Sequence, residues 1–453
     1  MTPLLVKIIQ LILSLSILIV LHELGHFIPA KIFKTRIEKF YLFFDPWFSL
    51  FKKKIGGTEY GIGWLPLGGY VKISGMIDES MDTEQMKTPP KSYEFRSKPA
   101  WQRLIIMIGG VTVNVILAFF IYAMILFGYG KEYVPIENLS YGVQADSLLL
   151  EHGIENGDRI KKVGEITPET LNEVNREILF GDARRLTLER DGREINVNLP
   201  EDIDQDLLAK GGTGFFFVRF PNQVEAVAPD SYAEKAGLHK GDRIVAVNNT
   251  DTEIFYDLTN TLEENKDQTV NLRIRREGRI VELQSQVDSL GRLGFIPTSD
   301  FSNFFETVKL EYGFFESFPA GVSEGTETLV SYVRSLKLIF SRQGVKQVGG
   351  FGTIAGLFGE IWDWERFWNM TAFLSIILAV MNLLPIPALD GGHVMFLLYE
   401  MIAGRQPNQK FMEYAQLFGI AVLLTLLLYA NGNDVVNADW FTRLSDWFSN
   451  LFN

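Results

Sequence analysis

Four long runs of apolar residues divide the chain, and each is long enough to cross a lipid bilayer as a helix. They extend from Leu4 to about Phe27, from Leu104 to Tyr129, between Arg366 and Asp390, and from about Ala415 to Tyr429. A cleaved signal peptide is the alternative for the first run, but the apolar sequence continues through charged residues and no small-residue cleavage site follows. We therefore expect a multi-pass α-helical membrane protein with four transmembrane helices.

The sequence between the second and third runs has another pattern, the alternation and charged turns of β-hairpins. It contains an internal repeat, because 145–163 aligns without gaps with 229–247, and both copies contain the run Gly-Asp-Arg-Ile. Strand-forming sequence with a charged turn follows each copy. We predict two α+β domains related by duplication, at 139–200 and 213–297.

The other segments complete the domain prediction. Membrane regions occupy 1–130 and 366–431, and the aromatic, amphipathic segment 298–365 predicts interfacial linker helices. The tail at 432–453 has Trp and Phe at helical spacing, which favours a helix in the membrane interface. A helix docked on a domain remains the alternative for the tail.

Positive charge orients the predicted spans. Twelve Lys and Arg residues lie between 31 and 98, and the short loop after the third span carries Arg405 and Lys410. Because Lys and Arg gather on the cytoplasmic side, both loops are expected there. The duplicated domains and both termini are then expected on the outer side of the cytoplasmic (inner) membrane.

Composition limits the chemistry. Among 453 residues there is no cysteine, so any metal must be held by His, Asp or Glu. The net charge of −12 argues against nucleic acid as a partner. The 47 % hydrophobic and 13 % aromatic content fits a membrane protein.

Besides Lys7, the first apolar run contains three ionisable residues close together, His22, Glu23 and His26, in the sequence HELGH. On a helix, residues four apart lie on one face, so the two imidazoles can share one zinc ion while Glu23 deprotonates a bound water. A charged side chain in the membrane centre costs at least ~2.5–3.5 kcal/mol, which makes a metal site a better explanation than chance.

A third ligand is expected, since catalytic zinc usually has three protein ligands and one open position. In "MNLLPIPALDGGHVMF", Asp390 ends a charge-free run, and Pro385 and Pro387 unwind the helix before it. His393, one helical turn later, is the alternative ligand. His152 and His239 fall in the outer repeats and are expected on the surface.

These motifs together resemble the site-2 protease family of intramembrane zinc metalloproteases. The resemblance rests on HELGH at 22–26, GGVTVN at 109–114 and NLLPIPALDGG at 382–392. The duplicated outer segment is similar to tandem PDZ domains, which points to the RseP-like branch. Residues 139–200 and 213–297 are then two PDZ-like domains outside the cytoplasm.

The resemblance implies roles for individual residues. It implies a zinc ion held by His22, His26 and Asp390, Glu23 as general base, and Asn382 as a donor to the oxyanion that forms at the scissile carbonyl. Asn382 could instead hydrogen-bond a neighbouring helix. The implied substrate-contacting residues are Gly61, Gly63, Gly68, Gly69, Tyr70, Gly110 and Asn114.

Two groups of these proposed substrate-contacting residues have an alternative interpretation. The glycine-rich segment Thr58–Gly75 is predicted to form a β-hairpin that dips into the membrane beside the active site and pairs with an unwound substrate. The alternative is an ordinary cytoplasmic hairpin. Gly110 and Asn114 equally fit a small-residue packing face between helices.

The expected function is hydrolysis of peptide bonds inside the transmembrane segments of single-span membrane proteins, in contact with the lipid bilayer. The resemblance suggests pre-trimmed anti-sigma factors and remnant signal peptides as substrates, with the PDZ pair as a size filter or as a receptor for new C-termini. A monomer is expected. The rival hypotheses are a membrane scaffold with a structural metal, which would not need Glu23, and an outward-facing membrane-anchored zinc protease.

Overall fold

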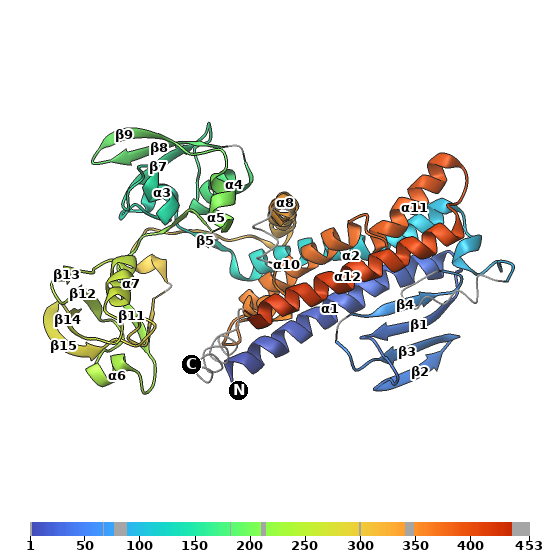
Figure 1. Ribbon diagram of the computed structural model, residues 1–453, viewed down its shortest axis with the longest axis horizontal. Helices are drawn as coiled ribbons and strands as arrows, with labels where there is room; N and C mark the ends of the chain where they lie inside the picture. The colour runs from blue at the N-terminus through green and yellow to red at the C-terminus, as the bar shows by residue number, and fades with distance from the viewer. Residues whose placement is uncertain are drawn as a thin grey trace, which may run out of the picture. The chain divides into compact units, whose positions relative to one another are not determined.

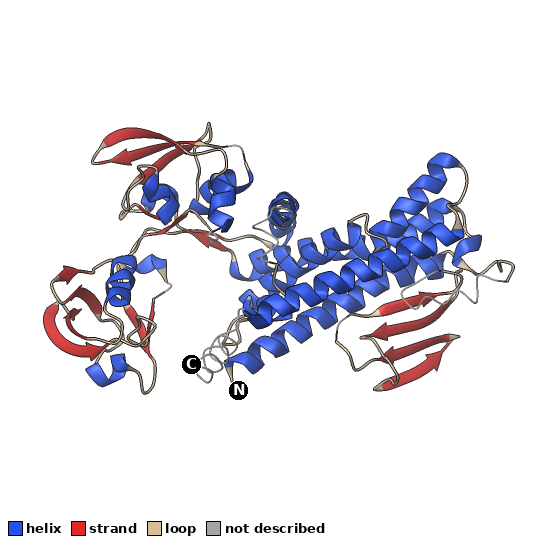
Figure 2. Cartoon of the chain, in the orientation of Figure 1, coloured by secondary structure: helices blue, strands red, loops and turns tan. Residues whose placement is uncertain are grey.

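The computed structural model describes residues 2–66, 68–76, 88–181, 183–209, 214–298, 300–339 and 348–436. These residues fall into two compact units (Figure 1). The membrane unit comprises residues 1–130 and 311–453, and the outer unit comprises 131–310. The first unit is mainly helical with one sheet, and the second is built from short strands and helices (Figure 2).

The four predicted spans are present as long apolar helices. They are α1 (Pro3–Ile32), α2 (Ala100–Tyr129), α10 (Trp364–Leu383) and α12 (Gln409–Val436), each long and apolar enough to cross a membrane. The unit also contains α8 (Phe314–Ile339), α9 (Phe351–Gly356) and α11 (Asp390–Ala403). α8 and α9 lie within the segment 298–365, for which linker helices were predicted. The interfacial helix predicted for the tail lies almost entirely outside the described residues, which end at Val436.

The helix α2 is central, and it touches α1 backbone to backbone. A Cβ added at Gly25 of α1 would lie 2.4 Å from the Gly109 carbonyl oxygen of α2. A Cβ added at Gly109 would lie 2.0 Å from the Gly25 carbonyl oxygen. Only glycine at both positions allows this approach, which brings the HELGH and GGVTVN motifs together.

A four-stranded sheet connects α1 and α2 and corrects the predicted hairpin. Its strands are β1 (Ile37–Leu42), β2 (Phe51–Ile55), β3 (Thr58–Ile62) and β4 (Tyr70–Ile73), in the order β2-β3-β1-β4. β3 and β4 do not pair with each other, because β1 lies between them, parallel to β3 and antiparallel to β4. The chain between β3 and β4 must pass over β1, and residues 63–69 are long enough for this connection, whereas a tight hairpin turn is not. β4 is therefore an edge strand among the described strands.

The outer unit reproduces the internal repeat as matching elements. The first copy contains β6 (Val143–Ala145), α3 (Ser147–Glu151), β7 (Arg159–Val163), α4 (Leu171–Phe180), β8 (Arg185–Arg190), β9 (Arg193–Asn198), α5 (Ile203–Ala209) and β10 (Phe216–Val218). The second contains β11 (Val224–Val227), α6 (Tyr232–Ala236), β12 (Arg243–Val247), β13 (Thr250–Asp251), α7 (Phe255–Glu264), β14 (Thr269–Arg276), β15 (Arg279–Gln286) and β16 (Phe295–Pro297). Each copy has its own buried apolar cluster. The strands β5 (Lys131–Tyr133) and β17 (Val308–Leu310) pair at the two ends of the unit.

The repeated Gly-Asp-Arg-Ile sequence has a structural explanation. Its aspartates, Asp158 and Asp242, are each 1 % exposed and accept hydrogen bonds from Arg190 and Arg276 at 2.7 Å. Each also accepts a backbone N–H three residues earlier in the chain. Burial alone would raise the pKa of Asp242, but the hydrogen bonds from Arg276 and from the His239 backbone outweigh it and lower that pKa.

Candidate metal centre

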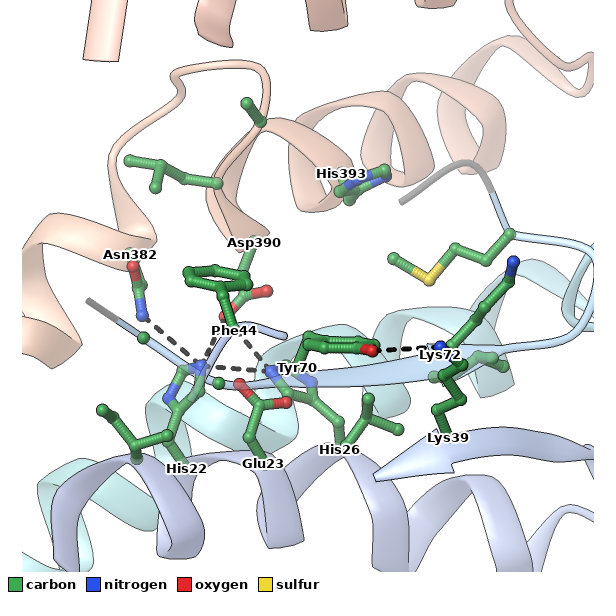
Figure 3. Close-up of a pocket in the computed structure, with 18 of the residues that line it drawn as sticks. His22, Glu23, His26, Lys39, Phe44, Tyr70, Lys72, Asn382, Asp390 and His393 are labelled. Carbon is green, nitrogen blue, oxygen red and sulfur yellow. Dashed lines mark hydrogen bonds and ion pairs between the residues drawn. The ribbon is translucent and has the colours of Figure 1, made fainter. Parts of the chain in front are cut away.

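Three ligand atoms meet inside the membrane unit, from two helices distant in sequence (Figure 3). His22 and His26 project from one face of α1 with their Nε2 atoms 3.2 Å apart. The Asp390 Oδ2 atom, at the start of α11, lies 3.3 Å from both Nε2 atoms. Among the described residues, these three form the group of side chains that could hold a metal ion, and His393 is not part of it.

The donor set fits a tetrahedral zinc ion. With metal–ligand bonds of about 2.0–2.1 Å, the ligand atoms of such a site lie roughly 3.3 Å apart, close to the three separations observed here. The Asp390 Oδ2 atom is also buried without a hydrogen-bond partner among the described residues. A buried carboxylate oxygen left in this state is expensive unless a cation occupies the space between it and the imidazoles.

The other ring nitrogen of each histidine is held by α2. His26 Nδ1 lies 2.8 Å from the Ile106 carbonyl oxygen, and His22 Nδ1 lies 3.1 Å from the Asn114 carboxamide. These contacts orient both rings with Nε2 toward Asp390. Gly110 packs directly beneath, since a Cβ there would lie 2.4 Å from His26 Nε2. Of the two roles left open for Gly110 and Asn114, this geometry favours packing and ligand orientation.

The segment between α10 and α11 presents Asp390. α10 ends at Leu383, and the proline-containing turn that follows has Ala388 in the left-handed region with φ +82°. Gly391 allows the turn to close on itself, because a Cβ there would lie 2.2 Å from the Leu384 carbonyl oxygen. The helix break predicted from Pro385 and Pro387 is thus present.

Two further groups lie beside the three ligands. Asn382 is near the end of α10, and its Nδ2 atom is 3.4 Å from His22 Nε2. Glu23 lines the same cavity from α1 and faces the start of β4, where a Cβ added at Gly69 would lie 3.7 Å from Glu23 Cγ. A carboxylate and an amide donor therefore flank the place where the ligand atoms converge.

The cavity has a volume of about 730 Å³ and extends from the ligands along β4. Gly68, Gly69 and Tyr70 line it, whereas Gly61 and Gly63 do not. Gly61 instead lies under the Tyr41 ring, and Gly63 lies against the backbone of Phe44. These two glycines serve the packing of the sheet.

Lys39, Phe44 and Asp45 are among the lining residues that had no signal in the sequence. The Tyr70 hydroxyl donates a hydrogen bond to Asp45 at 2.8 Å, and the Tyr70 ring stacks against Phe44. Burial, together with the Asp45 carboxylate, raises the pKa of Tyr70 above its usual range, so Tyr70 remains a hydrogen-bond donor. Only the fold brings these residues of β1, its following loop and β4 together.

Known proteins resemble the chain along nearly its whole length. Residues 10–426 match the family described as Peptidase family M50. A Vibrio cholerae protein named as a zinc metalloprotease is 29 % identical, covering 98 % of this chain and 100 % of its own length. The Regulator of sigma-E protease RseP of Escherichia coli is 28 % identical, covering 93 % of this chain and 97 % of its own. A Campylobacter jejuni protein, also named as a zinc metalloprotease, is 27 % identical over 95 % of this chain and 93 % of its own.

Proposed function

The chain belongs to peptidase family M50 and is a zinc metalloprotease with several membrane spans, and from this we propose that it cleaves peptide bonds within transmembrane segments of single-span membrane proteins. The observation that carries the proposal is the position of the three-ligand centre. His22, His26 and Asp390 converge between helices that are apolar enough to cross a bilayer, with Glu23 beside them. A structural metal site would not need a flanking carboxylate and normally fills all four positions with protein ligands.

In this proposal each residue has a separate task. When bound by His22, His26 and Asp390, a zinc ion would supply Lewis acidity toward the scissile carbonyl and the attacking water. Glu23 takes a proton from that water and delivers it to the leaving nitrogen. Asn382 donates a hydrogen bond to the carbonyl oxygen as negative charge develops on it. Ile106 and Asn114 keep the two histidine rings in place.

Substrate recognition is proposed to use the free edge of β4. Peptide bonds inside a helix are shielded by their own hydrogen bonds, so a substrate must be extended before it can be cut. β4 runs along the cavity, and β1 alone pairs with it among the described strands. An unwound substrate segment can add to the free edge as a further strand.

The test of the enzymatic proposal is Glu23→Gln. This change removes the base and keeps the size and shape of the side chain, so cleavage should fall by at least about 10²–10⁴-fold while zinc content stays at one per chain. Both are measured on purified protein in detergent, with a single-span substrate. Glu360→Gln, at an exposed carboxylate of the same unit, is the control and should change neither. Loss of zinc from Glu23→Gln would make Glu23 a structural group and contradict the proposal.

For the outer unit we propose the two PDZ-like domains predicted from the sequence, acting as a size filter. We propose that the unit lies outside the cytoplasm and the HELGH motif near the cytoplasmic side, because Lys and Arg gather in the loops predicted to be cytoplasmic. Peptide capture in the first copy is disfavoured by Asn175 of α4. Its side chain already bonds the backbone of β10, accepting from Phe215 N and Phe216 N and donating to the Phe216 carbonyl.

Deleting residues 141–297 and inserting a short linker tests the filter. β5 and β17 lie outside the deletion, and their pairing should hold the two ends of the remaining chain next to each other. The filter predicts that the shortened enzyme cuts trimmed substrates as before and also cuts untrimmed substrates that the intact enzyme spares. An unrelated folded domain of similar size in the same position is the control and should restore discrimination. If the folded, zinc-loaded deletion no longer cuts trimmed substrates, capture replaces the filter.

A further inference from the structure

The helix α12 buries few of its residues against the rest of the protein. Along its whole described length only Gln416, Gly419 and Ala430 are buried. Most of its other side chains are apolar and many are exposed, among them Phe418 at 68 % and Leu428 at 74 %, as expected for a helix in contact with lipid. Two of the three buried residues, Gln416 and Gly419, lie one turn apart on the same face.

Gln416 and Gly419 both meet the turn that presents Asp390. The Gln416 side chain is 3 % exposed, and its Oε1 atom accepts a hydrogen bond from the Ala388 backbone N–H at 3.2 Å. Gly419 lies against the residue before Ala388, because a Cβ there would lie 1.6 Å from the Pro387 carbonyl oxygen. The contact therefore consists of the buried Gln416 amide oxygen and the Gly419 backbone, which lie against the consecutive residues Pro387 and Ala388.

The turn requires such a partner. Pro385 and Pro387 have no backbone N–H to continue α10, and Ala388 adopts a left-handed conformation that is unfavourable for a residue with a side chain. In a bilayer, irregular backbone must be satisfied by other protein groups, since there is no water to do so. Without Gln416 the Ala388 N–H, two residues before Asp390, would have no acceptor among the described residues.

We propose that Gln416 is a positioning residue for the metal centre, and that α12 holds the Asp390 carboxylate at its ligating distance through Gln416 and Gly419. Gln416 also lines the zinc cavity, so it acts within the site although it belongs to a helix that faces lipid. The inference rests on the proposed role of Asp390 as a ligand. It gives the fourth span a role in metal affinity in addition to membrane anchoring.

The experiment measures the zinc dissociation constant of the full-length protein by competition with a chelator. Gln416→Leu removes the acceptor at nearly constant volume, and Gly419→Ala forces α12 away from the turn. Because second-sphere groups of metal sites typically change affinity 10–100-fold, both variants should raise the zinc Kd at least about tenfold. In cleavage assays at saturating zinc, kcat should fall while KM changes little.

Gly432→Ala is the matched control, because it is the same substitution on the same helix at a glycine with no neighbouring atom within 4 Å. It should leave the zinc Kd unchanged. A double variant adds a second criterion, since Gln416→Leu should have no further effect on zinc Kd once Asp390→Ala is present.

Two results would overturn the inference. One is a wild-type zinc Kd in folded Gln416→Leu and Gly419→Ala proteins. The other is a lower thermal midpoint with zinc Kd unchanged, which would make the contact merely structural. Failure of the proposed function would give a different result. The wild-type protein would then bind zinc, and the variants would still bind it more weakly, but the wild-type protein would not cleave membrane substrates.

Discussion

The membrane unit and the outer unit both bury aspartates, and they treat them in opposite ways. In the outer unit, Asp158 and Asp242 are each matched by an arginine and by a backbone N–H. In the membrane unit, Asp390 faces two imidazoles, and its Oδ2 atom has no hydrogen-bond partner among the described residues. The first arrangement is complete without any further group, and the second is not.

This difference separates a structural carboxylate from a ligating one. An arginine satisfies a buried carboxylate permanently, because it stays charged at any accessible pH. A histidine that ligates a metal does so as a neutral imidazole, so it does not supply the lasting positive charge that an arginine gives to a buried carboxylate. The outer unit repeats its arrangement in both copies, as expected of a scaffold element, whereas the described part of the membrane unit contains its arrangement once.

The largest expected effect comes from removing the ligating carboxylate. Asp390→Ala should abolish cleavage and lose most of the zinc, because two histidines alone do not complete the centre. Zinc content and substrate turnover are measured on the same preparation. His393→Ala is the control, since His393 lines the cavity but is not part of the ligand cluster. If zinc remains in Asp390→Ala and disappears in His393→Ala, the ligand assignment is wrong.

A smaller effect is expected from Asn382, which flanks the same centre without ligating. Asn382→Ala should retain zinc and lower kcat by roughly 10²–10³, the usual result of removing one oxyanion donor. Asn369→Ala, at a partly exposed asparagine whose Nδ2 donates to the Glu365 carbonyl of the same helix α10, should have no effect. Unchanged turnover in Asn382→Ala would reduce Asn382 to a packing residue.

No effect on the metal centre is expected from breaking an arginine pair in the outer unit. Arg276→Ala leaves Asp242 buried without its charged partner, so the outer unit should lose about 3–5 kcal/mol of stability. Hydrogen exchange of residues 224–286 in the full-length protein measures this loss. Arg275→Ala, which breaks an exposed pair with Glu253, should cost only about 0–1 kcal/mol. A fall in zinc content in Arg276→Ala would contradict the distinction between a structural aspartate in the outer unit and a ligating one in the membrane unit.

The sequence predicts the features that depend on local pattern and not those that depend on tertiary contact. Apolar run length gave the four spans, and helical spacing brought His22 and His26 to one face. The position of β1 between β3 and β4 is set by pairing between distant strands, which no local pattern records. Gln416 was missed for the same reason, because a lone glutamine in an apolar helix carries no sign of the turn it contacts.

The contact between Gly25 and Gly109 limits how this protein can vary. Neither glycine takes part in the chemistry, yet any side chain at either position would collide with the backbone of the other helix. A substitution at one position cannot be rescued by a change at the other, since both already have the smallest residue. In a deep mutational scan, Gly25 and Gly109 should tolerate as few amino-acid substitutions as the ligand residues themselves. The HELGH and GGVTVN motifs, although far apart in the sequence, therefore cannot vary independently at these two positions.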